Sequence, residues 1–240
     1  MRADDGVELV VRRSGSAADA TLVQLSGGPG CVNYLPDLGP EAPVRALSPE
    51  PRGVGSSGGG PHGIARAMAD LEDLRRTVGT ERWLVLGHSF GADLALAYAV
   101  EYPGSVAGVL AVCGTGIQND RDWKAAYEAG RAAEPAVDIE YDEAVHRSLT
   151  SSWRRWIKRP DLLARLSRLP VPVRFVLAGG DVRPSWPIEQ LAALTPDGSL
   201  HRVPAVPHDF WHTHPGVWRR LVAEYLAVTA AGRGAGRPCR

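Results

Sequence analysis

Ser89 stands at a junction between two kinds of sequence pattern, and its setting there suggests chemistry. Residues 83–86 (WLVL) are typical of a buried strand, and an alanine-rich helical pattern begins after Gly91. Turning from strand to helix within two residues forces unusual backbone angles and close chain approach, which favours glycine at Gly87 and Gly91. The resulting pattern, G-x-S-x-G, is that of a nucleophile elbow. The sequence therefore predicts that Ser89 is a nucleophile.

Two more polar residues follow predicted strands further along the chain. Asp181 comes after an apolar run and two glycines, whereas no carboxylate directly follows the strand predicted to end at Val112. His208 is the histidine nearest to the end of the last predicted strand, ahead of His212. A serine hydroxyl needs a base within hydrogen-bond reach near neutral pH, and an acid can orient that base. We expect Asp181 to be the acid and His208 the base, with His212 as the alternative base.

A third feature is the segment SGGPG, residues 26–30, which has almost no side chains. Its backbone can approach a ligand closely and expose amide groups to it. Attack of a serine on a carbonyl creates an oxyanion, which two backbone N–H groups would stabilise. We expect these donors to be the amide of Phe90, directly after the nucleophile, and the amide of Gly28. Together they would form an oxyanion hole.

Size and charge set limits on the partner. The chain has 240 residues, with 27 Lys and Arg against 27 Asp and Glu, so its formal net charge is zero. This length fits one large α/β domain. No overall field favours nucleic acid or an anionic membrane, so we expect a small-molecule substrate. The sequence does not predict an oligomeric state.

Cysteine usage and the N-terminal residues bear on cofactors and location. Cys31, Cys113 and Cys239 lack the spacing of metal ligands and are odd in number, so free thiols are expected. We expect no metal and no organic cofactor. The first residues carry early acids and no apolar signal region, and no apolar run reaches the length of a membrane span. The expected location is cytoplasmic.

One glycine pattern has a competing interpretation. Residues 53–58 match G-x-G-x-x-G, a dinucleotide-binding pattern. Such a site also needs a following strand that ends in an acidic residue for the ribose, and here that strand ends at Gly87 and His88. More glycine and Pro61 follow the match where a tight strand-to-helix turn should lie. A structural loop is therefore predicted.

Strand and helix patterns alternate along most of the chain. The first two β-rich runs, separated by a short glycine and serine segment, suggest a hairpin or meander. Strands are expected over residues 6–13, 20–25, 43–47, 83–86, 106–112, 171–178 and 199–203, and helices over 63–78, 92–102 and 215–227. This alternation predicts an α/β fold with a mostly parallel sheet, helices on both faces and the reactive loops at one edge.

Between two of these strands the pattern changes. Residues 114–169 show helical patterns with few strand signals, which predicts a helical cap inserted into a core of residues 1–113 and 170–230. Residues 231–240 are expected to form a flexible tail. Trp153 and Trp156 within the insertion could line a substrate pocket or form the core of the cap itself.

Taken together, these motifs resemble the proline iminopeptidase branch of the α/β-hydrolases. Residues 26–30 look like the H-G-G-P-G box of that branch, and residues 51–56 (PRGVGS) look like its Q-R-G-x-G-x segment. Residues 87–91 and 178–184 are similar to its elbow and its acid loop. The likeness spans most of residues 20–225. It implies an α/β-hydrolase fold and a serine hydrolase that uses a catalytic triad.

Two departures from the family pattern concern the substrate. Ser26 replaces the histidine that begins the family box. The family also has a W-x-x-W-E pattern whose glutamate helps to bind the free α-amine of the substrate, whereas Ile157 follows Trp156 here. A buried ammonium without an anionic partner is unfavourable. Other acids could replace that glutamate, and the candidates are Glu128, Asp138 and Glu140.

The expected function is therefore hydrolysis of a small ester, lactone or amide through an acyl-enzyme on Ser89. A proline iminopeptidase-type aminopeptidase is the first alternative. The second is a ligand-binding protein without catalysis on the same fold, because fold alone does not dictate function.

Overall fold

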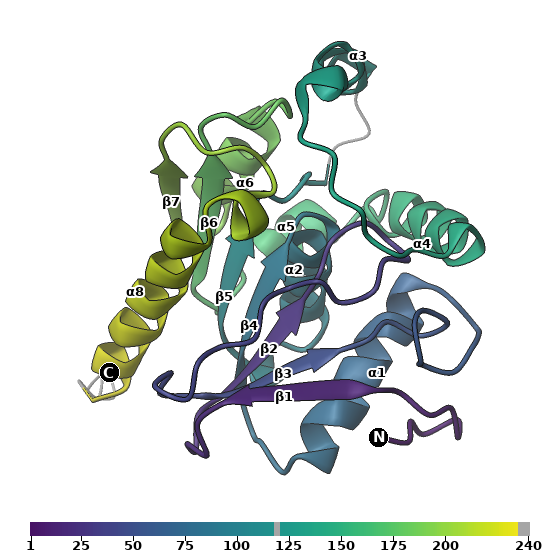
Figure 1. Ribbon diagram of the computed structural model, residues 1–240, viewed down its shortest axis with the longest axis vertical. Helices are drawn as coiled ribbons and strands as arrows, with labels where there is room; N and C mark the ends of the chain where they lie inside the picture. The colour runs from purple at the N-terminus through teal and green to yellow at the C-terminus, as the bar shows by residue number, and fades with distance from the viewer. Residues whose placement is uncertain (118–120, 235–240) are drawn as a thin grey trace.

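Seven strands form a single sheet at the centre of the molecule (Figure 1). The computed structural model describes residues 1–117 and 121–234, with residues 231–234 described by their backbone alone. The strands are β1 (Val11–Gly15), β2 (Thr21–Leu25), β3 (Arg45–Pro49), β4 (Trp83–His88), β5 (Val106–Val112), β6 (Val173–Ala178) and β7 (Gly198–Val203). Their order across the sheet is β1-β3-β2-β4-β5-β6-β7. All neighbours are parallel except β1 and β3, so the predicted mostly parallel sheet is confirmed.

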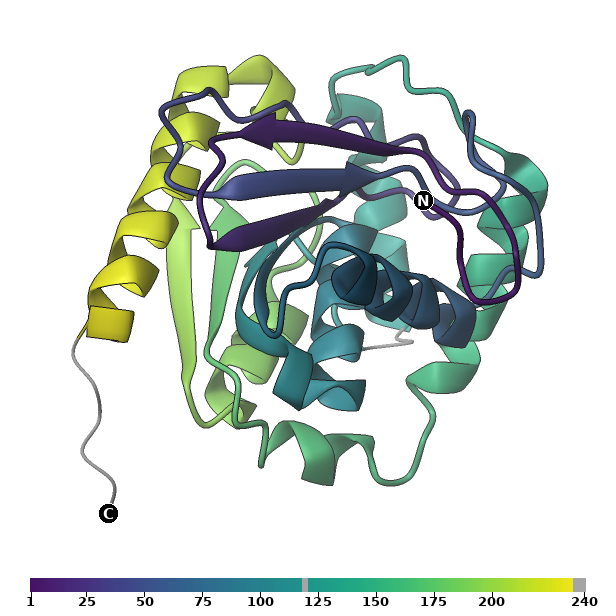
Figure 2. The same ribbon diagram turned by 90° about the horizontal axis from the view of Figure 1, so that it is seen from below.

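Helices cover both faces of this sheet (Figures 1 and 2). They are α1 (Ile64–Thr77), α2 (Phe90–Glu101), α3 (Arg121–Gly130), α4 (Glu143–Trp156), α5 (Leu162–Leu166), α6 (Trp186–Leu194), α7 (Phe210–Thr213) and α8 (Pro215–Gly234), with short 3₁₀ turns η1 (Pro103–Ser105) and η2 (Arg131–Ala133). Alternate residues of a strand point to opposite faces. Accordingly Val85 packs in one hydrophobic cluster with α1 and α2, while Leu84 and Leu86 pack in another with α8.

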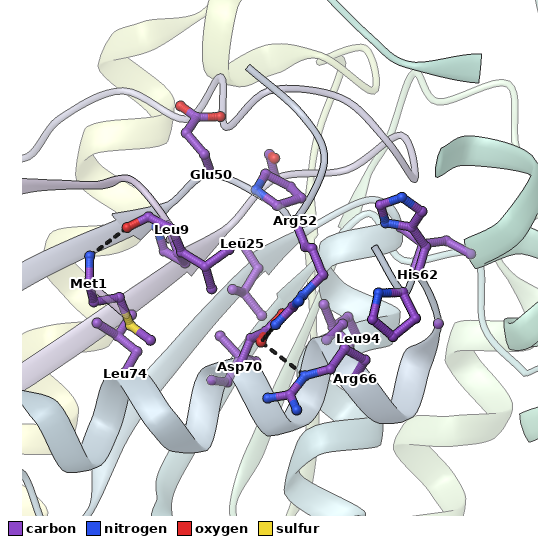
Figure 3. A pocket seen from close by; sticks show the side chains of 18 residues that line it. Met1, Leu9, Leu25, Glu50, Arg52, His62, Arg66, Asp70, Leu74 and Leu94 are labelled. Carbon is purple, nitrogen blue, oxygen red and sulfur yellow. Dashed lines mark hydrogen bonds and ion pairs between the residues drawn. The ribbon is translucent and has the colours of Figure 1, made fainter. Parts of the chain in front are cut away.

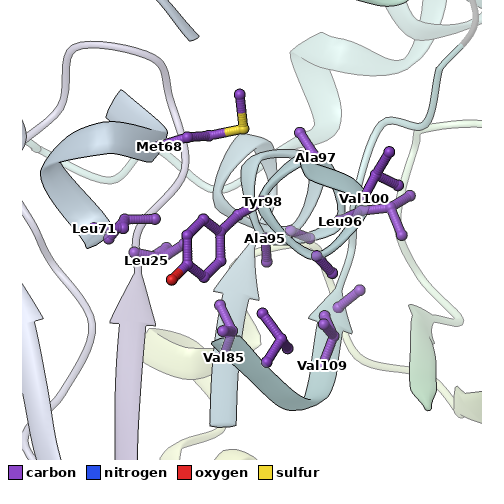
Figure 4. Packing of buried hydrophobic residues seen from close by; sticks show 14 of the residues in the cluster. Leu25, Met68, Leu71, Val85, Ala95, Leu96, Ala97, Tyr98, Val100 and Val109 are labelled. Atoms are coloured by element: carbon purple, nitrogen blue, oxygen red, sulfur yellow. The ribbon is translucent and has the colours of Figure 1, made fainter. Parts of the chain in front are cut away.

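Helix α2, which follows Ser89, is buried on nearly all sides. Its small side chains Ala95, Ala97 and Ala99 have no exposed surface, which lets the helix lie close to the sheet. Figure 4 shows the ring of Tyr98 lying between Leu25 of β2 and Ala95. The start of α2, and with it Ser89, is therefore held firmly against the strands.

The N-terminal hairpin expected from the sequence is wrong. Strand β1 runs antiparallel to β3, with Val11 opposite Pro49, and does not pair with β2. The reason is that both edges of β2 are already taken by parallel partners, β3 on one side and β4 on the other. Strand β1 therefore joins the free edge of β3, next to β2. Residues 53–58 form turns, as predicted for a structural loop.

The chain between β5 and β6 forms helices α3, α4 and α5, with no strand among its described residues. This is the segment expected to be a cap. At the other end, α8 continues to Gly234, beyond the predicted end at residue 227. Residues 235–240 of the expected tail, and Cys239 with them, lie outside the described residues. Helices α6 and α7 were not predicted.

Within residues 1–117 and 121–234, none of the helices is both long enough and apolar enough to span a membrane.

Candidate active site

Ser89 occupies a strained turn between β4 and α2. Its φ angle is 56°, in the left-handed region that residues with a side chain rarely adopt. The flanking glycines are required by packing. A Cβ at Gly87 would lie 2.1 Å from the carbonyl oxygen of Gly91, and a Cβ at Gly91 would lie 2.1 Å from that of Leu25. The structure thus shows the physical reason for the G-x-S-x-G spacing.

Asp181 and His208 lie together at the ends of β6 and β7. His208 Nδ1 donates a hydrogen bond of 2.6 Å to Oδ2 of Asp181, and His208 is only 5% exposed. This bond fixes the proton on Nδ1 and leaves Nε2 as the nitrogen that can accept a proton. The alternative base, His212, is exposed in α7 and has no such contact recorded among the described residues.

The carboxylate of Asp181 is held on both oxygens. Its Oδ1 accepts hydrogen bonds from the backbone amide of Arg183 at 2.9 Å and from the Arg183 guanidinium at 3.0 Å. Burial alone would raise the pKa of Asp181. The hydrogen bond from His208 and the positive charges of His208 and Arg183 outweigh that effect and lower the pKa to about 2. Asp181 is therefore ionised across the ordinary pH range.

His88, the residue before Ser89, contacts His208. The Nε2 of His88 donates to the carbonyl oxygen of His208 at 3.0 Å, and the two imidazole rings lie 4.8 Å apart. No hydrogen bond between the Ser89 hydroxyl and His208 occurs among the described residues. Such bonds are often long without substrate and tighten in the reacting complex. Asp181 and His208 are thus joined by a hydrogen bond, and His88 connects His208 to the turn that carries Ser89.

Two backbone amides beside Ser89 are available to a ligand. The amide of Gly27 already donates to the Tyr34 hydroxyl at 2.8 Å. By contrast, the amides of Gly28 and Phe90 have no acceptor recorded in the part of the chain that the structure describes. A Cβ at Gly27 would lie 2.4 Å from Cβ of Ser89, so this loop lies directly against the serine. The role of the Gly28 and Phe90 amides as oxyanion donors stays a prediction.

The insertion touches both loops of the candidate site. Gly30 and Val32 form backbone hydrogen bonds with residues 140–142. Nδ1 of His146 lies 2.8 Å from the carbonyl oxygen of Pro29. On the other side, Arg183 pairs with Glu134. Sequence reasoning missed Arg183, although its position two residues after the acid was a signal. It also gave Tyr34 no role.

The tryptophans that could line a pocket are buried. Trp153 and Trp156 are each 8% exposed and stack on one another with centroids 5.1 Å apart. Trp153 meets the ring of Phe90 edge to face at 6.0 Å, and Trp156 donates to Glu101 at 3.3 Å. They belong to the main core cluster. Their role as pocket lining stays a prediction.

The acids that could replace the family's cap glutamate are dispersed. Glu128, Asp138 and Glu140 are all exposed, and Glu128 pairs with Arg131. Ile157 lies at the end of α4 and packs against the core. Glu134, which the sequence analysis did not consider, is the insertion's acid that pairs with the acid loop.

A cavity lies beside the site, between α1 and the ends of β2 and β3 (Figure 3). Its lining includes Ser26 but not Ser89, Asp181 or His208, and is otherwise largely apolar. Its charged groups bind one another. Arg52 forms hydrogen bonds of 2.6 and 2.9 Å with Asp70. This cavity is therefore separate from the candidate chemistry.

One cluster has the residue types of a metal site. Ligand atoms of His88, Cys113 and His208 lie within 4.8 Å of one another. Hydrogen bonds already occupy both nitrogens of His88 and Nδ1 of His208. Burial raises the pKa of the Cys113 thiol, which disfavours the thiolate that binds metals. The arrangement favours hydrogen bonding over metal ligation.

Comparison with known proteins agrees with this geometry. Residues 20–160 match the model of a family described as the alpha/beta hydrolase fold. The chain belongs to the α/β-hydrolase family. The predicted fold class and the family resemblance are thereby confirmed.

Individual relatives of this α/β-hydrolase carry hydrolase names. A proline iminopeptidase of Xanthomonas citri is 34% identical over 109 residues, which are 42% of this chain and 34% of that protein. The match thus spans about a third of the length of that relative. RutD of Shigella flexneri, named as a candidate carbamate hydrolase, is 26% identical in an alignment of 250 positions that covers 88% of this chain and 92% of that protein. The structure of a Mycobacterium smegmatis proline iminopeptidase superposes with a TM-score of 0.70 at 17% identity, covering 95% of this chain and 97% of the other.

Proposed function

We propose that this α/β-hydrolase cleaves a small ester, lactone or amide through an acyl-enzyme on Ser89, with Asp181 and His208 completing a catalytic triad. The observation that carries the proposal is the 2.6 Å bond between Asp181 and His208, next to a serine held at a φ of 56°. Backbone strain of this kind is found at functional sites. The unpaired amides of Gly28 and Phe90 beside that serine support the same conclusion.

The mechanism follows from the roles of these groups. His208 Nε2 takes the proton of the Ser89 hydroxyl as Oγ attacks the substrate carbonyl, and the negative charge moves to the carbonyl oxygen. The amides of Gly28 and Phe90 stabilise that oxyanion. His208 then gives its proton to the departing alcohol or amine, and the carbonyl re-forms as an acyl ester on Ser89. Water, deprotonated by His208, releases the acid by the same two steps. Asp181 stabilises the imidazolium throughout.

A second candidate is an aminopeptidase with a free-amine substrate, which the name of the Xanthomonas citri relative favours. Such a substrate requires an anion for its ammonium group. The insertion's acid nearest to the acid loop, Glu134, is already paired with Arg183. Ile157 occupies the position of the family's glutamate. A neutral ester, lactone or amide therefore fits this site better.

A fluorophosphonate probe tests the serine. The wild-type protein should be labelled covalently at Ser89, and Ser89→Ala should abolish labelling and lower kcat by about 10⁴-fold or more. Ser199→Ala, which changes an exposed serine in β7, is the matched control and should leave both unchanged. Well-folded wild-type protein that takes up no probe would overturn the enzyme proposal and favour a ligand-binding protein.

Substrate preference is tested by comparing a short acyl ester with an amide of N-terminal proline. The ester should give the higher kcat/KM. A strong preference for the free-amine amide would show that an ammonium site exists in spite of Ile157, and would reverse the ranking of the two candidates.

A further inference from the structure

A chain of hydrogen bonds runs behind the candidate site and joins its three loops. The amide of Gly27 donates to the Tyr34 hydroxyl at 2.8 Å, and that hydroxyl lies 2.7 Å from Nδ1 of His88. On the other side of the ring, Nε2 of His88 lies 3.0 Å from the carbonyl oxygen of His208. One phenol and one imidazole thus connect the glycine loop, the elbow and the loop of the base.

The direction of every proton in this chain is determined. A carbonyl oxygen only accepts hydrogen bonds, so Nε2 of His88 must carry a proton and donate a hydrogen bond to the carbonyl oxygen of His208. The neutral ring then presents Nδ1 as an acceptor, and the Tyr34 hydroxyl donates to it. That leaves the Tyr34 oxygen free to accept from the amide of Gly27. All three bonds are satisfied by one tautomer of His88, without any charge.

The surroundings keep His88 neutral and fixed. His88 has no exposed surface, and its burial, followed by the charge of His208, lowers its pKa well below the usual value. The ring of Trp218 meets it edge to face at 6.0 Å. Tyr34 stacks on Trp211 at 4.6 Å. A group held this way has no role as a proton donor in the reaction, but it is well suited to fix geometry.

We propose that His88 and Tyr34 are positioning residues, which together set the distance between the oxyanion amide of Gly28 and the base His208. This inference rests on the proposed hydrolase function of Ser89. Tyr34 engages the amide of Gly27, so the next amide, that of Gly28, is the one left to meet an oxyanion. His88 holds the backbone of His208 from the residue next to the nucleophile. A single bridge therefore aligns donor, nucleophile and base.

Removing the Tyr34 hydroxyl is the mildest test, because Tyr34→Phe keeps the ring and its stacking. It leaves the Gly27 amide and the His88 Nδ1 without partners. We expect kcat and the rate of fluorophosphonate labelling to fall about 10- to 100-fold, as when reacting groups shift by an ångström, with KM nearly unchanged. Tyr98→Phe is the matched control. It also removes a buried hydroxyl, one bonded to Glu72, but away from this bridge, and should leave kcat unchanged.

Two substitutions at His88 separate the two arms of the bridge. The side-chain nitrogen of His88→Gln reaches the position of Nε2 and can still donate to His208. The shorter side chain of His88→Asn ends near the position of the His88 Nδ1. It can accept the hydrogen bond of the Tyr34 hydroxyl but does not reach the carbonyl oxygen of His208. We expect His88→Gln to keep several-fold more of the wild-type kcat than His88→Asn. Equal stability losses in both variants with equal kcat would show a structural role alone and overturn the inference.

A spectroscopic measurement tests the bridge independently of activity. In ¹⁵N-labelled protein, His88 should show a neutral ring protonated on Nε2, and Tyr34→Phe should shift its Nδ1 resonance. Two results would contradict the bridge and leave the hydrolase proposal intact. In the first, the fluorophosphonate probe labels wild type and Tyr34→Phe at the same rate. In the second, the spectrum shows His88 protonated on Nδ1. If the fluorophosphonate probe does not label the wild-type protein, the hydrolase proposal itself is contradicted. The ¹⁵N spectrum of His88 then still tests the hydrogen bonds of the bridge.

Discussion

Two helices of the inserted segment, α3 and α4, are attached to the molecule in different ways. Helix α3 contains no buried residue, whereas α4 buries one complete face. The buried residues of α4 are Val145, Leu149, Trp153 and Trp156. A helix that buries apolar side chains gains most of its stability from tertiary packing. Helix α4 is therefore an extension of the core, whereas α3 lies outside it.

Helix α3 is connected to the loop of Asp181, the proposed catalytic acid. The Arg183 guanidinium donates to Asp181 at 3.0 Å, pairs with Glu134 and lies 4.7 Å above the ring of Tyr127. Gly130 at the end of α3 also packs closely on Val182, since a Cβ there would lie 2.9 Å from that side chain. These contacts connect the end of α3 and the residues after it to the loop of Asp181.

The largest difference between the two helices should appear on truncating an aromatic residue. Trp153→Ala should lower the free energy of unfolding by about 3–5 kcal/mol, because it leaves a cavity in the core. Tyr127→Ala in α3 should lower it by about 1 kcal/mol or less. Chemical denaturation of both variants measures this. Similar losses in the two would show that α3 and α4 are anchored equally.

The connection between core and insertion should respond to pH. Asp93 of α2 is buried and accepts hydrogen bonds from the amides of Thr115 and Gly116, at 3.1 and 2.9 Å, where the insertion begins. Burial outweighs these bonds and raises its pKa to about 7. Its folded pKa thus lies above the unfolded value, so the carboxyl favours folding most below about pH 4 and loses that advantage as pH rises to about 7.

Replacing the carboxyl of Asp93 tests the direction of this pH dependence of stability. The stability of Asp93→Asn relative to wild type should increase from pH 4 to pH 8, by up to about 4 kcal/mol. Unfolding titrations at several pH values provide the measurement, with Asp37→Asn at an exposed position as control. A difference that stays constant with pH would mean that Asp93 is ionised throughout.

The smallest expected effect concerns the ion pair between Glu134 and Arg183, which connects α3 to the loop of Asp181. Glu134→Gln removes one charge from the Arg183 pair, and we expect a loss of about 1–2 kcal/mol in the local stability of α3. Hydrogen exchange of α3 amides should accelerate about tenfold while that of α4 amides stays constant. Glu128→Gln, in an exposed pair, is the control. Acceleration in both helices would show that the insertion moves as one unit.

Much of the site could be predicted because its signals are local. The glycines around Ser89 and the position of Asp181 after a buried strand are each visible within a few residues. His208 could be ranked above His212 by distance from the strand end. The parallel sheet followed in the same way from alternating patterns. Each of these predictions depended on short-range spacing alone.

The rest depends on contacts between distant parts of the chain. The partner of β1 was decided by which sheet edge remained open, and no residue of β1 indicates that. Tyr34 meets His88 across 54 positions of sequence, and Arg183 meets Glu134 across 49. No sequence motif indicates either contact.

The order of strands has a consequence for how activity arises during folding. From β4 the sheet is extended in sequence order through β5 and β6 to β7, and Asp181 and His208 follow the last two strands. In the proposed mechanism, a chain folded only as far as β5 carries the nucleophile without its acid and base and is expected to be inactive. Recovery of the proposed activity on refolding should therefore report the docking of the last strand, and timing it against helix formation would separate the two events.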